Sequence, residues 1–188
     1  MKVLTDSSLF DQWISRTGNI PEKPFEHVAA IDYRNFMAFG YTEIFLVDVI
    51  DAIRSMADDE DAEEICYLFT APDPRSYFDE TGFFGAVTFR PDEPSSDIEE
   101  ALYAPRRGLE VYSIYETSHR TYVLPSRGSW MIVADRDADL ALLCFRSAED
   151  LQRFRLLSPT LEGFDTLADA ATHARSFMDY DLDLGALS

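Results

Sequence analysis

Residues 110–146 read EVYSIYETSHRTYVLPSRGSWMIVADRDADLALLCFR, and this stretch decides the fold. It alternates runs rich in Tyr, Val, Ile and Leu, which fit the pleated surface of a sheet, with short polar connections. Pro125 presets φ and Gly128 permits φ > 0, so residues 125–128 predict a turn. We therefore expect the centre of an antiparallel sheet. The expected strands are residues 110–115, 120–124, 130–134 and 140–145, the last two joined by a hairpin loop at 135–139.

Helical spacing of apolar residues is found on both sides of this stretch. Residues 41–57 predict a helix capped by Thr42, with a polar stripe opposite an apolar one. Its polar stripe is Asp48, Asp51, Ser55 and Asp58, and its apolar stripe is Phe45, Val49, Ile53 and Met56. Further helices are expected after Asp6 and at 97–103, 148–157 and 166–178; further extended runs are expected at 27–33, 35–39, 65–71 and 82–90, with Gly85 marking a bulge or close backbone approach.

This order of elements predicts an α+β fold. Helices gather before residue 60 and after residue 147, whereas strands fill most of the middle, which differs from a βαβ alternation. We expect a mainly antiparallel sheet of five or six strands with helices packed on one face. The length of 188 residues suits a single globular domain, with an acidic tail from about residue 179.

The charge balance is strongly acidic. Thirty-five Asp and Glu residues against sixteen Lys and Arg give a formal net charge of -19. Such a field repels nucleic acid and anionic membranes and attracts basic proteins. The acidity either serves solubility alone or steers a basic partner, and the composition leaves both readings open.

The two cysteines and the amino terminus bear on the cellular compartment. Cys66 and Cys144 each lie inside an apolar run, where a reduced thiol behaves as a small hydrophobe, so no disulfide is expected. The first residues, MKVLTDSSLFDQW, lack the apolar core of a secretory signal, and no apolar run is long enough to span a membrane. We expect a cytoplasmic protein.

Two acidic segments are the candidate partner-binding surfaces. Carboxylates crowd residues 58–64 and recur through residues 92–100, with aromatic residues nearby as possible anchors. The acidic candidates are Asp58, Asp59, Glu60, Asp61, Glu63, Glu64, Asp92, Glu93, Asp97, Glu99 and Glu100, and the aromatic ones are Tyr77, Phe78 and Tyr103. For the first segment, a solvated loop without a partner is the competing interpretation.

The sequence contains no catalytic motif and no metal-binding motif. His119 lies in a polar patch with Glu116 and Tyr122 near it, which is the one arrangement that suggests acid–base chemistry. The spacing of carboxylates at 135–139 matches the start of a calcium loop, but Leu140 replaces the required Gly and Arg146 the required Glu. We therefore predict no catalytic residue, no metal and no cofactor.

The segment SWMIVADRDADLALLCF, with Trp130, Ile132 and Val133 leading into Asp135 and Asp137, resembles the late sheet hairpin of small immunity proteins of bacterial polymorphic-toxin systems. The resemblance implies a cytosolic protein that binds one cognate toxin and blocks its active site or its substrate access, with no chemistry of its own. It implies a basic toxin domain as partner, because toxin nucleases are often basic and an acidic surface can take the place of phosphate. It assigns no binding residue.

Two other classes of function remain open at this stage. A small enzyme would use His119 in a pocket at the end of the sheet. A structural subunit of a phage or secretion system would self-associate through an apolar sheet face or an edge strand, whereas the binding protein is expected to be a monomer or a weak homodimer.

Overall fold

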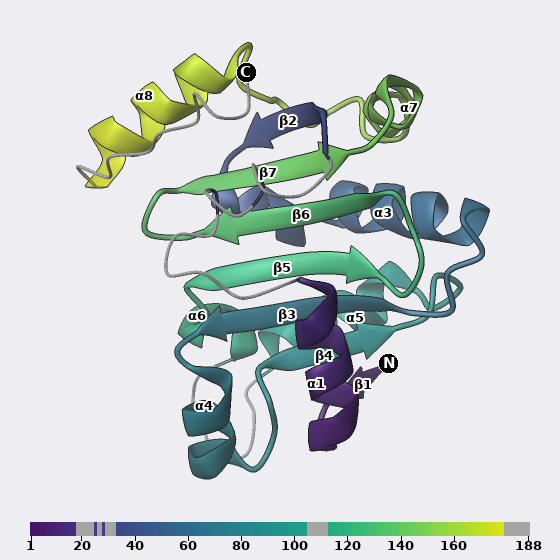
Figure 1. Cartoon of the computed structure of the whole chain (residues 1–188), viewed down its shortest axis with the longest axis vertical. Coiled ribbons are helices and arrows are strands. Elements are labelled where there is room, and N and C mark those ends of the chain that lie inside the picture. Colours follow the sequence, from purple (N-terminus) through teal and green to yellow (C-terminus); the bar gives the residue numbers. More distant parts are fainter. Residues whose placement is uncertain (18–24, 26–27, 29–32, 105–112, 179–188) are drawn as a thin grey trace.

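A seven-stranded antiparallel sheet forms the middle of the molecule (Figure 1). This computed structural model describes residues 1–17, 25, 28, 33–104 and 113–178. The strand order is β1-β4-β3-β5-β6-β7-β2, and all neighbouring strands are antiparallel. The α+β class is confirmed, with seven strands where five or six were expected. The strands are β1 (Lys2–Val3), β2 (Asn35–Phe39), β3 (Ile65–Ala71), β4 (Ala86–Phe89), β5 (Arg120–Pro125), β6 (Trp130–Asp135) and β7 (Leu140–Phe145).

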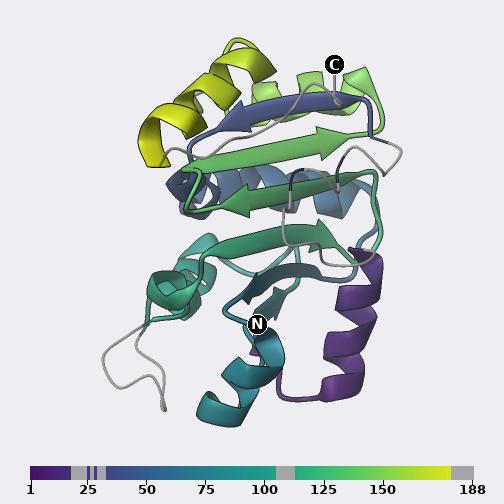
Figure 2. The same ribbon diagram turned by 60° about the vertical axis from the view of Figure 1, so that its left-hand side comes forward.

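Helices cover both faces of this sheet. Helices α3, α5 and α7 pack on one face, and α1 and α8 pack on the other. Figure 1 shows α3 and α5 behind the sheet and α1 in front of it, and α3 stays behind the sheet in the turned view of Figure 2. The helices are α1 (Ser7–Arg16), η1 (Tyr41–Phe45, a 3-10 helix), α3 (Val47–Asp59), α4 (Pro74–Thr81), α5 (Ser95–Tyr103), α6 (Ile114–Thr117), α7 (Ala148–Leu157) and α8 (Leu167–Met178). The expected packing on one face describes α3, α5 and α7 but not α1 and α8.

The central strands supply two cores because their side chains alternate between the two faces. In β6, Ile132 packs with the α3 side and Val133 with the α1 side; in β7, Leu143 and Leu142 do the same. All residues of β6 and β7 are buried. Cys144 and Cys66 are free thiols within the second core, and burial raises the pKa of both.

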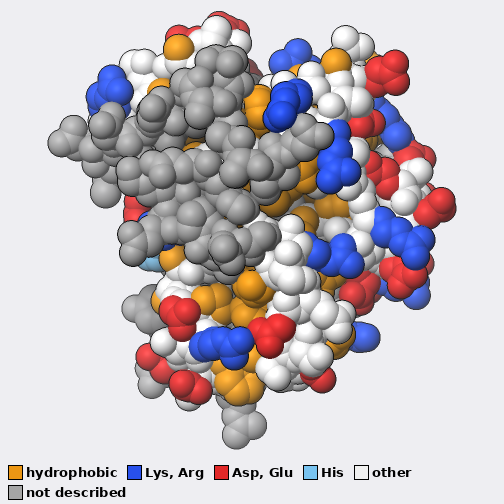
Figure 3. Space-filling model, in the orientation of Figure 1, with side chains coloured by type: hydrophobic (Ala, Val, Ile, Leu, Met, Phe, Trp, Pro, Cys, Tyr) orange, Lys and Arg blue, Asp and Glu red, His pale blue; other side chains and the backbone are white. Residues whose placement is uncertain are grey.

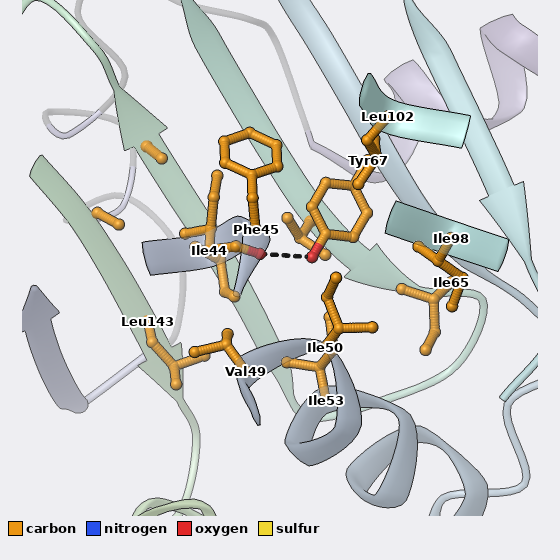
Figure 4. Close-up of a cluster of buried hydrophobic side chains, with 14 of the residues drawn as sticks. Ile44, Phe45, Val49, Ile50, Ile53, Ile65, Tyr67, Ile98, Leu102 and Leu143 are labelled. Carbon is orange, nitrogen blue, oxygen red and sulfur yellow. Dashed lines mark hydrogen bonds between the residues drawn. The ribbon is translucent and has the colours of Figure 1, made fainter. Parts of the chain in front are cut away.

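Helix α3 is held against the sheet by a cluster of aliphatic and aromatic side chains (Figure 4). The hydroxyl of Tyr67 on β3 donates a hydrogen bond to the carbonyl of Ile44, 2.7 Å away. That carbonyl lies in η1. The expected continuous helix over 41–57 is divided at Leu46, whose backbone is extended (φ -71°, ψ 143°), and Leu46, in place of Thr42, stands at the start of α3.

The expected strand at 110–115 is wrong in its last part. Ser113 and Glu116 form a capping box, in which each side chain accepts a hydrogen bond from the other residue's backbone, and this starts helix α6. The β-favouring Ile114 and Tyr115 lie inside that turn. Residues 110–112, residues 27 and 29–32 of the expected extended run, and the acidic tail from 179 lie outside the described residues. Val28, within that run, is helical and not extended.

Glycine positions explain the shape of the region between α4 and β4. Gly82 ends α4 in the left-handed conformation at φ +80°, so the expected strand over 82–90 begins only at Ala86. A Cβ on Gly85 would lie 3.3 Å from the Cβ of Phe69, which confirms the close backbone approach expected there. Together these positions bring α4 close to β3.

Candidate functional site

The two acidic segments meet beside helix α3. Arg54 on α3 donates from Nε to the carbonyl of Pro91, 2.9 Å away, and from Nη1 to Asp51, 2.7 Å away. This ties the helix to the turn that carries Asp92. A hollow of about 270 Å³, which we call the α3–α5 hollow, lies at this junction. Its lining residues are Asp51, Arg54, Ser55, Asp58, Pro91 and Asp92.

The α3–α5 hollow is acidic. Three carboxylates line it against a single guanidinium, and that guanidinium is already paired with Asp51. Asp92 accepts hydrogen bonds from Arg90, which hold its pKa below the usual range. Asp58 is exposed. With Arg90 counted, three carboxylates face two guanidiniums, so a charged group that enters this hollow from a partner meets an excess of one negative charge.

Helix α5 extends the acidic surface away from the hollow. It packs on α3 and the sheet through Ile98, Ala101 and Leu102, so its other positions face solvent. Glu99 and Glu100 are exposed and form no ion pair in the part of the chain that the structure describes. Asp97, in the first turn, is also exposed. These carboxylates sit on a helix that is fixed by its buried side.

Three of the six carboxylates of segment 58–64, those of Asp59, Glu60 and Glu63, have partners within the molecule instead. Glu60 Oε1 accepts from the backbone N–H of Ser129 at 3.0 Å and from its hydroxyl at 2.6 Å. Asp59 forms an ion pair with Arg153, and Glu63 lies 4.0 Å from Arg127. In the second segment Glu93 pairs with the amino-terminal ammonium of Met1. Of the candidates in segment 58–64, Asp58 alone lines the hollow.

The three candidate aromatic anchors have different environments. Tyr77 is only 6% exposed and packs edge-on against Phe83, so it belongs to the core and is wrong as a surface anchor. Phe78 is half-buried and stacks on Phe84. Tyr103 is 41% exposed at the end of α5 and packs against Tyr115 at 4.7 Å between ring centres. Tyr103 is thus the anchor that adjoins the acidic surface.

The region around His119 differs from the catalytic arrangement, His119 with Glu116 or Tyr122, that the sequence suggested. His119 is half exposed, and its Nδ1 lies 3.1 Å from Asp137. The Glu116 carboxylate is held by Ser113 in the capping box, which lowers its pKa. The hydroxyl of Tyr122 is buried without a hydrogen-bond partner. Neither expected partner therefore bonds to the imidazole.

The carboxylates of the 135–139 loop serve separate roles. Asp135 is buried, pairs with Arg120 at 3.2 Å and has its pKa raised by burial. Asp139 pairs with His173 at 3.0 Å. Arg136 stacks over the rings of Tyr41 and Tyr115, a role that its charge alone did not indicate. Among the described residues, no three His, Cys, Asp or Glu side chains are close enough together to hold a metal ion.

The face opposite to α3 has a different charge pattern. Figure 3 shows acidic and basic side chains interspersed there, with hydrophobic side chains visible between α4 and α1. Arg75 of α4 and Asp11 of α1 form an ion pair at 2.8 Å across this region. No helix in the described part of the chain has the length and apolar character needed to cross a bilayer.

Comparisons with known proteins identify no relative. Models of protein families, curated proteins and solved structures were searched, and none matches the chain.

Proposed function

We propose that the chain is a non-enzymatic acidic binding protein of the immunity type, which neutralises a basic toxin domain by covering its active site. The α3–α5 hollow is the observation that carries this proposal. It joins Asp51, Asp58 and Asp92 in one surface. Helix α5, which begins three residues after Asp92, carries the exposed Glu99 and Glu100. The resemblance of residues 129–145 to the hairpin of immunity proteins points in the same direction.

In the proposed mechanism, different contacts set the association rate of the complex and its lifetime. Long-range attraction between an acidic surface and a basic partner raises the association rate, whereas a few buried contacts set the dissociation rate. The carboxylates beside α3 supply the attraction, and Tyr103 supplies an aromatic contact at the edge of the surface. Because α3 and α5 are packed on the sheet, the carboxylates are preorganised and little ordering entropy is lost on binding.

We propose a monomer in the cytoplasm, with a weak homodimer as the other possible state. The edge strand β2 is partly covered by the chain itself, since the N–H of Phe164 donates to the carbonyl of Ala38 at 2.8 Å. The other edge strand, β1, has two residues, one of them Lys2. Short or covered edges disfavour pairing between copies, which argues against the assembly-subunit alternative.

The enzyme alternative has a direct test in His119→Ala. This side chain is exposed and pairs only with Asp137 among the described residues, so the substitution should leave the fold intact. If the proposed binding function is right, the variant protects against the toxin as well as the unchanged protein does. Loss of protection with an unchanged fold would favour a catalytic role for His119.

The proposal itself is tested with the product of the neighbouring gene. We expect a basic toxin domain encoded beside this chain to arrest growth when expressed alone and to be neutralised when both are expressed. The purified pair should associate at a rate that falls steeply as salt is raised, because salt screens attraction between exposed charges. A neighbouring product that neither binds nor harms cells would contradict the proposal.

A further inference from the structure

A second hollow lies at the amino-terminal end of α3, between that end and the loop that follows α7. Its volume is about 240 Å³. We call it the α3–α7 pocket, because α3 and α7 also pack against each other. Its lining residues are Glu43, Leu46, Asp48, Val49, Ser158, Thr160, Leu161 and Glu162.

The charge in this pocket has one sign. Glu43, Asp48 and Glu162 come from three different parts of the chain, and none of the lining residues is basic. Asp48 accepts a hydrogen bond from the hydroxyl of Thr160 at 2.6 Å, which joins two of these parts. Burial and the nearby Glu162 raise the pKa of Glu43, as expected for a carboxylate that faces another without a cation between them.

Two polar groups in the pocket wall have unmet hydrogen bonds. Ser158 is 2% exposed, and its hydroxyl has no hydrogen-bond partner. The Oε2 atom of Glu43 is likewise buried without a partner. A buried acceptor without a donor is costly, and the cost is larger for a charged group. Glu43 Oε2 therefore lacks a donor and the Ser158 hydroxyl lacks any partner. A bound cation with N–H groups would donate to both, because a hydroxyl oxygen also accepts hydrogen bonds.

The nature of that cation follows from the remaining features. The positive end of the α3 dipole is equivalent to about half a charge, which three carboxylates outweigh, so an anion is disfavoured. Within the described residues the carboxylates do not converge as metal ligands do. Leu46, which is 53% exposed, and Leu161 provide an apolar wall beside the carboxylates. Such a wall suits the methylene stem of an alkylammonium.

We propose that the α3–α7 pocket binds a primary alkylammonium group, and that in the complex this group is a lysine side chain of the basic partner. The second part rests on the proposed function. Asp48 in this pocket and Asp51 in the α3–α5 hollow are three residues apart on α3, so their Cα atoms are separated by about 4.5 Å along the helix axis. A single partner surface lying across α3 can therefore contact both the α3–α7 pocket and the α3–α5 hollow.

The experiment titrates the protein with n-butylammonium chloride and follows the backbone amide resonances of Asp48, Thr160 and Glu162. The expected result is a saturable shift of these three resonances. n-Butanol, which has the stem without the charge, should give a smaller, non-saturating change. Equal responses to both compounds, or no saturable response, would overturn the proposal.

Charge-neutral variants locate the binding. Glu43→Gln with Glu162→Gln should weaken n-butylammonium binding by about tenfold or more, since a hydrogen bond to a charged group contributes about 1.5 kcal/mol or more. Glu162→Gln alone, at an exposed position, guards against misfolding of the double variant and should also weaken binding. Asp79→Asn with Glu80→Gln, on α4, removes the same charge elsewhere and should leave binding unchanged. Unchanged affinity in the folded Glu162 variants would overturn the assignment.

This test separates the two proposals. It uses no partner protein, so a failure to bind n-butylammonium leaves the neutralisation of a toxin domain as proposed. Conversely, if the neighbouring product does not bind, a saturable response to n-butylammonium still supports an ammonium pocket. If both hold, Glu162→Gln should slow association with the partner less than it speeds dissociation, because a lysine seated in a pocket is a short-range contact.

Discussion

The two acidic segments have similar composition, but the carboxylates of segment 58–64 and those that the second segment places on α5 have different environments in the folded chain. Segment 58–64 uses Asp59, Glu60 and Glu63 in contacts with Arg153, Ser129 and Arg127, all far away in sequence. On α5, Glu99 and Glu100 face solvent without a basic partner in the described part of the chain. A dense run of acidic residues therefore does not by itself mark a binding surface, because the fold can use those residues to hold its own loops.

Gly128→Ala is expected to change the free energy of unfolding most, because the added Cβ would displace the Glu60 side chain that accepts hydrogen bonds from Ser129. Gly128 has φ +154°, and a Cβ there would lie 2.3 Å from Glu60 Oε2 and 2.5 Å from Pro125 Cγ. Backbone strain and these contacts together should lower the free energy of unfolding by about 3 kcal/mol. Urea denaturation followed by circular dichroism measures the change.

Gly82→Ala is the matched control for this prediction. Gly82 also has positive φ, at +80°, but a Cβ there would have no atom within 4 Å. Its substitution therefore costs only the left-handed conformation, about 1 kcal/mol. If both variants lose the same stability, contact with Glu60 and Pro125 contributes nothing, and the turn at 125–128 is not organised by the acidic segment.

Glu60→Ala compared with Glu99→Ala tests the contrast between the segments directly. Truncating Glu60 leaves the N–H of Ser129 without its acceptor, while the Ser129 hydroxyl keeps Asp150 as acceptor at 3.0 Å, so the free energy of unfolding should fall by about 2 kcal/mol. Truncating the exposed Glu99 should change it by no more than about 0.5 kcal/mol. Equal changes in the free energy of unfolding at the two positions would show that the hydrogen bonds of Glu60 contribute no measurable stability.

Association with the basic partner should show the reverse order. Neutralising Asp51, Asp58 and Glu99 as Asn, Asn and Gln removes two exposed charges that line the α3–α5 hollow and one on α5, and we expect the association rate at low salt to fall about tenfold. Stopped-flow mixing measures this rate. The same number of charges removed at Asp59, Glu63 and Glu64 should slow association less. If both triple variants slow it equally, net charge alone steers the partner, and the hollow has no special role.

Local signals in the sequence predicted much of the fold. The expected elements at 65–71, 140–145 and 148–157 coincide with β3, β7 and α7, because each is bounded by turn residues or, for α7, begins at the cap Ser147. The sequence analysis predicted helices on one face of the sheet only. The continuous apolar runs of β3 and β7 are, however, what a strand buried on both faces requires. The sequence did not predict helix α6, because Ile114 and Tyr115 favour strands, whereas the helix begins at the capping box of Ser113 and Glu116.

The candidate site was less predictable because it depends on contacts between distant residues. Asp58 and Asp92 were both identified, but their meeting depends on Arg54 reaching the carbonyl of Pro91. Tyr77 and Tyr103 are both helical tyrosines, and only the position of the sheet decides that the first is buried and the second exposed. The α3–α7 pocket combines Glu43, Asp48 and Glu162 from three separate parts of the chain, and no local pattern joins them.

Asp73→Asn is expected to give the smallest effect and separates a carboxylate used by the fold from one that faces solvent. Asp73 caps α4 by accepting from the N–H of Ser76 at 2.9 Å, and this bond lowers its pKa below the ordinary 3.8. The native state therefore binds fewer protons than the unfolded state, so the stability from this carboxylate is present above pH 3.8 and is lost as pH falls through the lowered pKa. Asn caps a helix about as well but does not titrate.

The unchanged protein and the Asp73→Asn variant should accordingly have similar melting temperatures near pH 7. As the pH is lowered below about 3.8, the melting temperature of the unchanged protein should fall more than that of the variant. Scanning calorimetry across this range measures the gap, and Glu99→Gln supplies the comparison for a carboxylate that bonds to no described residue. The effect is small because Asp73 is exposed and water screens the interaction. A difference in melting temperature that stays constant with pH would mean that the Asp73 carboxylate contributes no more stability than the exposed carboxylates of α5. The contrast between carboxylates bonded within the fold and exposed ones would then not extend to the helix caps.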